Sequence, residues 1–269
     1  MKNKLFIAGP CVIESRDHIF EVAAFLNEIG IKYIRGGCFK LRTSSSSFQG
    51  LGEKAVYFLK EAAIQYNLKT VSEIIDIRQI DLMAENIDIL QIGTRNMYNY
   101  PLLSEIGKRK NPIILKRGFS ATIDEWLSSA EYIKNSGNKN IVLCERGIRT
   151  FNKYTRNTLD LSCVPYLKMK TNYKVIVDPS HGTGIRELIS PMSKASMACG
   201  ADGIIVEIHN FPERALCDKE QAINYDEFQK LFGIESYNFY PEEFIFDNFN
   251  IIINGRKIVI FFKNSKKLE

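Results

Sequence analysis

The chain has no long hydrophobic run and no paired cysteines. No apolar stretch approaches the roughly 20 residues that a membrane-spanning helix needs. Its opening residues lack the length and the small-residue cleavage site of a signal peptide. The six cysteines form no Cys-x-x-Cys pair and follow no regular spacing. We therefore expect a cytoplasmic protein without membrane contact, whose thiols are free or bound to metal.

The chain also lacks a strong excess of charge. The net charge is +5, and the basic residues are spread along the sequence instead of running together. This distribution speaks against a nucleic-acid partner and favours cations placed singly around a site for small anions. A content of 45% hydrophobic and 25% charged residues is ordinary for a globular protein. The length of 269 residues suits a single α/β barrel, which needs roughly 250.

Eight short apolar runs recur along the chain, and reactive side chains follow each of them. The runs cover residues 5–8, 33–34, 70–72, 89–92, 113–115, 141–144, 175–177 and 203–206. The side chains that follow are Cys11, Arg35, Glu73, Arg95, Lys116, Glu145 with Arg146, Asp178 with His181, and Glu207 with His209. In a (β/α)8 barrel the carboxyl ends of the strands meet at one face, where active sites are built. The pattern predicts an α/β fold of this kind, a TIM barrel, that handles phosphates.

Amphipathic patterns between the runs predict helices. They cover residues 16–29, 53–66, 77–85, 122–136 and 190–199. In the last of these we expect Ser190 as the N-cap, Pro191 as the first helical residue and Gly200 as the stop. Strands that alternate with helices imply a parallel sheet with right-handed crossovers.

The segment after residue 234 does not continue this alternation. Ile251–Ile253, Asn254-Gly255 and residues 257–262 predict a β-hairpin on a type I′ turn. We therefore divide the chain into a catalytic barrel, 1–234, and a short C-terminal β-hairpin tail, 235–269. Because the hairpin is too apolar to stay exposed, we expect it to pack on its own barrel or on a neighbouring subunit.

Four residues far apart in the sequence could form one metal site: Cys11, His181, Glu207 and Asp218. A thiolate, an imidazole and two carboxylates suit a first-row divalent ion, with Mn, Fe, Co, Zn and Cu all compatible. The alternatives are that Cys11 is a small buried hydrophobe and that His181 is a turn residue. His209 would share a face with Glu207 if the strand continued, and His18 is expected to be structural.

Five cations follow the predicted strands: Arg35, Lys40, Arg95, Lys116 and Arg146. Cations that converge on one face repel one another unless anionic ligands fill the space between them. Arginine suits two-point recognition of phosphate and carboxylate, and lysine supplies a point charge. Lys40 and Arg42 lie in the long polar segment 36–52, where hydroxyls follow them; a flexible basic surface loop fits that composition equally well.

Eight ordered motifs give the chain a specific resemblance. They are Ala-Gly-Pro-Cys-Val-Ile-Glu-Ser (8–15), Lys-Leu-Arg-Thr-Ser (40–44), Ser-Phe-Gln-Gly-Leu-Gly (47–52), Ile-Gly-Thr-Arg-Asn-Met (92–97), Leu-Lys-Arg-Gly (115–118), Cys-Glu-Arg-Gly-Ile-Arg-Thr-Phe (144–151), Asp-Pro-Ser-His-Gly-Thr-Gly (178–184) and Val-Glu-Ile-His-Asn-Phe-Pro-Glu-Arg-Ala-Leu-Cys-Asp (206–218). Together they resemble 3-deoxy-D-arabino-heptulosonate 7-phosphate (DAHP) synthase of the smaller bacterial and archaeal type I beta subtype.

The resemblance implies an aldol-type condensation of phosphoenolpyruvate (PEP) with D-erythrose 4-phosphate, the first step of the shikimate pathway, in a homo-oligomer (dimer or tetramer). By motif position it implies metal ligation by Cys11, His181, Glu207 and Asp218, with Mn²⁺ expected first and Co²⁺, Fe²⁺ or Zn²⁺ as alternatives. It implies substrate binding by Arg35, Lys40, Arg42, Thr43, Ser44, Arg95, Lys116, Glu145 and Arg146. Lys40 is expected to protonate the new alkoxide as a general acid and to act with Cys11 and His181 in catalysis.

The chain departs from the family's motifs at one position, and three other assignments of its function are considered. The family usually has proline where this chain has Leu41, so the sugar-phosphate loop is expected to be freer. The nearest alternative is 3-deoxy-manno-octulosonate 8-phosphate synthase, which uses arabinose 5-phosphate; Lys40 favours the four-carbon sugar. A sialic-acid synthase and a non-catalytic barrel subunit are more distant alternatives. Because the tail is short for an added regulatory domain, we expect no strong feedback inhibition by phenylalanine or tyrosine.

Overall fold

The computed structural model describes residues 4–42, 44, 46–232, 242–245, 249–254 and 257–262, with side chains as far as Leu231. The chain divides into two compact units, Lys2–Tyr225 and Asp226–Glu269, and each is described by itself. The predicted domain boundary at residue 234 lies outside the described residues. Among the described residues, no helix is long and apolar enough to cross a membrane.

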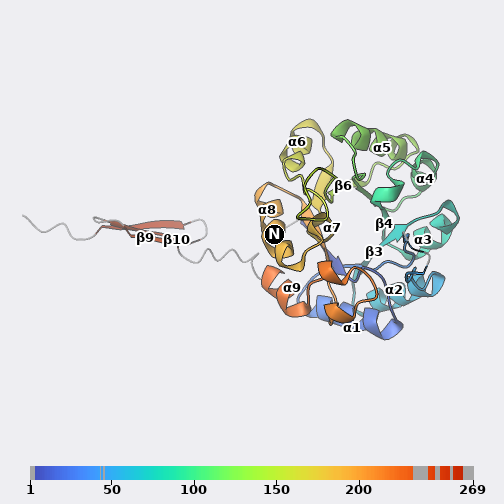
Figure 1. The fold of residues 1–269 in the computed structure, drawn as a ribbon, viewed down its shortest axis with the longest axis horizontal. Coiled ribbons are helices and arrows are strands. Elements are labelled where there is room, and N and C mark those ends of the chain that lie inside the picture. The colour runs from blue at the N-terminus through green and yellow to red at the C-terminus, as the bar shows by residue number, and fades with distance from the viewer. Residues whose placement is uncertain are drawn as a thin grey trace, which may run out of the picture. The chain divides into compact units, whose positions relative to one another are not determined.

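Eight parallel strands close into a barrel in sequence order, as predicted. They are β1 (Leu5–Gly9), β2 (Tyr33–Arg35), β3 (Lys69–Ile74), β4 (Ile89–Ile92), β5 (Ile113–Lys116), β6 (Ile141–Glu145), β7 (Lys174–Val177) and β8 (Gly203–Glu207). Helices surround the strands as an outer ring (Figure 1). Hydrogen-bonded register between β1 and β8, from Leu5 with Gly203 to Gly9 with Glu207, closes the barrel.

The helices that connect the strands are α1 (Arg16–Glu28), α2 (Glu53–Gln65), α3 (Ile80–Asn86), α4 (Tyr100–Ile106), α5 (Ile123–Asn135), α6 (Cys163–Lys170), α7 (Pro179–Thr183) and α8 (Arg186–Ala198), and α9 (Tyr225–Phe232) follows β8. A 3-10 turn, Ile77–Gln79, precedes α3. The predicted helices near residues 16, 53, 77 and 122 are confirmed. The sequence patterns missed α4, α6, α7 and α9, all of which have eight residues or fewer and so offer few turns in which a period can be recognised.

The predicted start of the helix at residue 190 is wrong. The helix α8 begins four residues earlier, at Arg186, and Pro191 lies inside it. Proline inside a helix removes a backbone donor and destabilises it. Here the turn before Pro191 buries Ile189 completely, and we attribute the longer helix to that burial.

Apolar side chains fill the inside of the barrel. Seven strands contribute one buried residue each to this cluster: Ile7, Val71, Ile89, Ile114, Cys144, Ile176 and Ile205. The partly buried Tyr33 of the remaining strand packs against them. Because the interior is a packed core, a substrate site can lie only at the ends of the strands.

Gly9 allows the first two strands to approach closely at their carboxyl ends. It has φ 151°, and a Cβ atom there would lie 1.9 Å from the Arg35 carbonyl oxygen. A side chain at this position would push the strands apart. This approach sets Arg35 beside Cys11, which follows Gly9 by two residues.

The second unit contains β9 (Glu242–Ile245), β10 (Phe249–Asn254) and β11 (Lys257–Phe262) in an antiparallel sheet of order β11-β10-β9. Asn254 pairs with Lys257, which confirms the predicted hairpin pairing. The predicted turn includes Gly255, which lies outside the described residues. The strand β9 was not predicted, and the packing of the hairpin on a barrel stays a prediction.

Candidate active site

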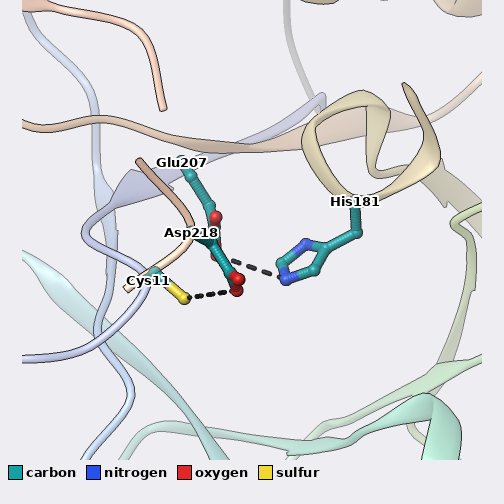
Figure 2. Close-up of side chains that lie close together, drawn as sticks. All are labelled: Cys11, His181, Glu207 and Asp218. Carbon is teal, nitrogen blue, oxygen red and sulfur yellow. Dashed lines mark hydrogen bonds and ion pairs between the residues drawn. The ribbon is translucent and has the colours of Figure 1, made fainter. Parts of the chain in front are cut away.

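The predicted metal ligands come together at the carboxyl end of the barrel. One donor atom from each of Cys11, His181, Glu207 and Asp218 lies within 4.8 Å of the others. The Cys11 Sγ atom is 3.2 Å from Asp218 Oδ2, and His181 Nε2 is 3.3 Å from Glu207 Oε1 (Figure 2). Cys11 follows β1, His181 lies in α7 after β7, and Glu207 ends β8 with Asp218 in the loop beyond. The barrel therefore assembles in space a set that is scattered in sequence.

Asp178 fixes the orientation of the His181 ring. Its carboxylate accepts the His181 backbone N–H at 2.9 Å, and its Oδ2 is 2.7 Å from His181 Nδ1. Burial raises the pKa of Asp178, but His181 and Lys116 outweigh that effect and hold it well below its ordinary value. An ionised carboxylate at Nδ1 keeps a proton there and leaves Nε2 as the free donor atom. This is the usual support of a metal-binding histidine.

The donor set fits a divalent ion. Bonds of about 2.0–2.3 Å from one ion reach donor atoms so placed with small side-chain shifts. A thiolate, an imidazole and two carboxylates suit a first-row transition metal. Burial, with the hydrogen bond to Cys217, raises the pKa of the Cys11 thiol well above its ordinary value. Metal binding would have to displace that proton.

Arg35 holds two of the predicted metal ligands, Glu207 and Cys11, in position. Its Nη1 donates to Glu207 Oε1 at 2.6 Å, and its Nη2 donates to the Cys11 carbonyl oxygen at 3.1 Å. Gln221 donates to the other oxygen of Glu207 at 2.6 Å. Burial raises the pKa of Glu207, but His181 and Arg35 outweigh it and bring the pKa to about 2. Arg35 was expected at the substrate and does not line the cavity described next.

A cavity of about 240 Å³ opens beside the metal cluster. Six of its lining residues are cations: Lys40, Arg42, Arg95, Lys116, Arg146 and Arg156. Two carboxylates, Glu73 and Asp218, also line it. The cavity is therefore predominantly cationic and fits anionic ligands.

Two of these cations, Arg95 and Arg146, have no ion pair with any described carboxylate. Their guanidinium carbons lie 5.7 and 5.2 Å from the centre of the Phe119 ring, and Arg149 lies 4.3 Å from the same centre. Burial lowers the pKa of Arg146. Arg146 is buried and Arg95 is exposed. A buried cation without a carboxylate partner, such as Arg146, is suited to binding an anion from outside.

Lys40 lies where the cavity meets the metal cluster. Its Nζ is 2.8 Å from Cys11 Sγ and 3.3 Å from Asp218 Oδ2. Burial lowers the pKa of Lys40, but the surrounding thiol and carboxylate groups raise it by more. The ammonium form is therefore the stable one, and it can hold a proton between the two parts of the site.

Glu145 does not lie where the sequence predicted a substrate contact. It is fully buried, and its carboxylate accepts hydrogen bonds from Arg117 Nη1 at 3.0 Å and from the Gly147 N–H at 2.6 Å. It does not line the cavity. Thr43, also expected at the substrate, lies outside the described residues, whereas Ser44 does line the cavity.

The structure adds residues that the sequence did not indicate. The Sγ atom of Cys217 is 3.3 Å from that of Cys11, and the guanidinium of Arg42 also contacts it. Phe119 and Arg156 line the cavity. Phe119 follows the Leu-Lys-Arg-Gly motif directly, and Arg156 follows the Cys-Glu-Arg-Gly-Ile-Arg-Thr-Phe motif by five residues, so proximity to a motif was the available signal. His209 lies after β8 has ended, where it contacts Glu14 and not the cluster.

Comparisons with known proteins agree with this geometry. Residues 2–236 match the family model described as the DAHP synthetase I family. The phospho-2-dehydro-3-deoxyheptonate aldolase of Thermotoga maritima is 52% identical over 225 residues, which cover 84% of this chain and 67% of the relative. A 2-dehydro-3-deoxyphosphooctonate aldolase of Desulfotalea psychrophila is 32% identical, over 84% of this chain and 86% of the relative.

Solved structures lead to the same group of proteins. The crystal structure of DAHP synthase from T. maritima has a TM-score of 0.85 at 49% identity, covering 87% of this chain and 69% of that one. A truncated form of 3-deoxy-D-arabino-heptulosonate 7-phosphate synthase from T. maritima has a TM-score of 0.81 at 47% identity, covering 86% of this chain and 85% of that one. The chain belongs to the DAHP synthetase I family.

Proposed function

We propose that this chain condenses PEP with D-erythrose 4-phosphate to give DAHP and phosphate, with the cationic cavity as its substrate site and the cluster of Cys11, His181, Glu207 and Asp218 as its metal site. The observation that carries the proposal is the adjacency of these two features at one end of the barrel. A condensation of two phosphorylated substrates requires both anion binding and activation of a carbonyl.

Three of the cations that line the cavity fit PEP. Arg95, Arg146 and Lys116 line the same cavity, and the two arginines lack described carboxylate partners. A carboxylate and a phosphate on a three-carbon skeleton would bring the opposite charge that these side chains need. Lys116 also contacts Asp178 at 2.5 Å, so PEP would share this lysine with the residue that orients His181. Removing Arg95 should mainly damage PEP use, by roughly 2–4 kcal/mol.

Three other residues of the cavity fit the phosphate of the sugar. Arg42 and Ser44 come from the loop after β2, and Arg156 comes from the segment after β6. The three line one cavity, and we propose that they hold the sugar phosphate together with Thr43. The free aldehyde end of the sugar would then face Lys40 and the metal cluster.

Lys40 is proposed as the general acid. As PEP C3 bonds to the aldehyde carbon, the carbonyl oxygen becomes an alkoxide, and the Lys40 ammonium can donate a proton to it. Water then adds at C2 of the former PEP, and cleavage of the C–O bond releases phosphate. Glu145 and Arg35 act indirectly in this scheme, because they hold Arg117 and Glu207.

A divalent ion in the cluster would supply Lewis-acid polarisation of the aldehyde. Mn²⁺ is the first candidate, with Co²⁺, Fe²⁺ and Zn²⁺ as alternatives. Chelation should abolish turnover and Mn²⁺ should restore it. Cys11→Ala should lose the metal while the barrel stays folded.

A phosphate-release assay tests the proposal directly. The chain is supplied with PEP and either erythrose 4-phosphate or arabinose 5-phosphate, before and after chelation. We expect a higher kcat/KM with erythrose 4-phosphate and no activity after chelation. Preference for arabinose 5-phosphate would assign the octulosonate reaction instead, and full activity in excess chelator would remove the metal from the scheme.

We further propose a homo-oligomer, a dimer or a tetramer, in the cytoplasm. All six cysteines are free in the described structure, which fits a reducing compartment. Analytical ultracentrifugation tests the assembly, and a monomer at micromolar concentration would contradict it.

A further inference from the structure

Glu14, His18 and His209 form a second cluster of metal-binding side chains. One donor atom from each lies within 4.8 Å of the others. Glu14 lies between β1 and α1, His18 in the first turn of α1, and His209 just after β8. None of these residues belongs to the substrate cavity or to the first metal cluster.

Both imidazoles of this cluster are buried, and three of their ring nitrogens lack partners. His18 is 9% exposed and His209 is 6% exposed. Among the described residues, His18 Nδ1, His18 Nε2 and His209 Nε2 have no hydrogen-bond partner. The two rings lie 4.5 Å apart between centroids and are tilted by 45°, so they pack against one another. Leaving a buried polar atom without a partner destabilises a fold, so such a group calls for an explanation.

Glu14 adds a carboxylate that is already oriented. Its Oε1 accepts the Leu216 backbone N–H at 2.7 Å. Its Oε2 lies 3.5 Å from His209 Nε2, which is longer than a usual hydrogen bond. The side chain is 17% exposed, so the cluster is open to solvent on this side.

We propose that Glu14, His18 and His209 bind a second divalent transition-metal ion. Two imidazoles and one carboxylate are the protein ligands of many zinc sites, where water takes the fourth position. A bound ion would give each buried imidazole the partner that it lacks. Burial lowers the pKa of His18 to about 4, so this ring is neutral at neutral pH, as ligation requires.

Binding through His209 Nε2 needs one proton to move. The Phe211 N–H lies 2.9 Å from His209 Nδ1, which keeps the ring proton on Nε2 in the metal-free chain. The same N–H lies 3.0 Å from Asn210 Oδ1, a second acceptor. When the metal takes Nε2, the proton moves to Nδ1, and the Phe211 N–H keeps its bond to Asn210.

Such an ion would join the start of α1 to the loop after β8. Glu14 already binds the backbone of Leu216, which is next to Cys217 and two residues before Asp218. The second ion would therefore brace the segment that carries one ligand of the first metal cluster.

Cobalt titration of the full-length, metal-stripped chain tests the proposal. Co²⁺ bound through Cys11 gives a thiolate charge-transfer band, whereas Co²⁺ bound by nitrogen and oxygen alone does not. We expect two equivalents in the unmodified chain, one with the band and one without. His18→Gln should keep the first and lose the second. Asp17→Asn, an exposed neighbour on the same helix, should keep both.

The outcomes separate this site from the first one. Cys11→Ser should lose the charge-transfer band and still bind one equivalent. Glu14→Gln, which leaves both imidazoles in place, should also lose the Co²⁺ equivalent that shows no charge-transfer band. This variant provides the test if His18→Gln fails to fold. Retention of both equivalents in the folded Glu14→Gln and His18→Gln variants would overturn the proposal, as would a single equivalent in the unmodified chain.

Discussion

The Sγ atom of Cys11 lies 3.3 Å from the Sγ atom of Cys217. The two cysteines are 206 positions apart in the sequence. Cys11 is a proposed metal ligand, and Cys217 directly precedes another, Asp218. A small movement of either side chain would allow a disulfide, whose sulfur atoms are about 2.05 Å apart. A disulfide here would remove a thiolate from the metal cluster.

We therefore predict that diamide treatment of the metal-stripped chain prevents Mn²⁺ from restoring its activity. The two thiols would lose two electrons and two protons to diamide and form a Cys11–Cys217 disulfide, and dithiothreitol would reverse the reaction. Peptide mass spectrometry would detect the linked pair, and metal rebinding would report the loss of the site. Cys217→Ser should resist this effect, whereas the distant Cys199→Ser should not. Equal sensitivity of Cys217→Ser and the unmodified chain would contradict the prediction.

The second prediction concerns the support of His181. Asp178→Asn removes the charge that holds the proton on Nδ1 and turns Nε2 toward the cluster. We expect metal affinity to fall by roughly 10- to 100-fold, as for other carboxylates behind a metal-binding histidine. Competition with a coloured chelator measures the affinity. Asp124→Asn, an exposed control on α5, should not lower it. An unchanged affinity in Asp178→Asn would show that Asp178 does not support metal binding.

The sequence predicted the barrel well because each strand is a short apolar run with a reactive residue at its end. That order is local, and it survives in the structure from β1 to β8. The metal ligands could be named because each lies in one of the ordered motifs. Their convergence follows from the fold, since the carboxyl ends of barrel strands share one face.

What the sequence could not predict depends on contacts between distant side chains. Glu145 was expected at the substrate, but Arg117 on the neighbouring strand's loop engages it instead. The proximity of Cys217 to Cys11 depends on the conformation of the loop after β8. Pro191 was predicted to be the first residue of its helix because proline favours that position. The burial of Ile189 outweighed this preference, and the helix begins earlier. In each case tertiary packing decided between two locally acceptable arrangements.

The third prediction concerns Phe119, the ring that Arg95 and Arg146 share. An aromatic ring attracts guanidinium groups and can help to position both of them at the cavity. Phe119→Leu keeps the apolar volume and removes this attraction. We expect the KM for PEP to rise about 5- to 30-fold, from a loss of about 1–2 kcal/mol, with a smaller change in kcat. Phe119→Tyr should stay near the unmodified chain, and an equal defect in both variants would exclude the role of the aromatic ring.

The side chain of Asp202, just before β8, forms a hydrogen bond to β7 at the end of the barrel opposite the candidate active site. Its Oδ2 accepts the Val175 N–H at 2.9 Å, and its Oδ1 accepts from Lys168 at 2.6 Å. Burial raises the pKa of Asp202, but these hydrogen bonds outweigh it and lower the pKa below its ordinary value of 3.8. The folded state therefore favours the ionised carboxylate more than the unfolded state does.

The fourth prediction follows from this shift. A carboxylate whose pKa is lowered by folding adds stability above its unfolded pKa, and the contribution disappears as the pH falls through the folded value. Asp202→Asn can still accept from Val175 but loses the ion pair with Lys168, so it should be destabilised by about 1 kcal/mol at pH 7. Urea unfolding should give the same difference at pH 5 and a smaller one below pH 3.8. Asp124→Asn, an exposed control on α5, should change little across this range. A difference between Asp202→Asn and the unmodified chain that stayed constant from pH 7 to pH 3 would mean that the carboxylate charge does not stabilise this end of the barrel.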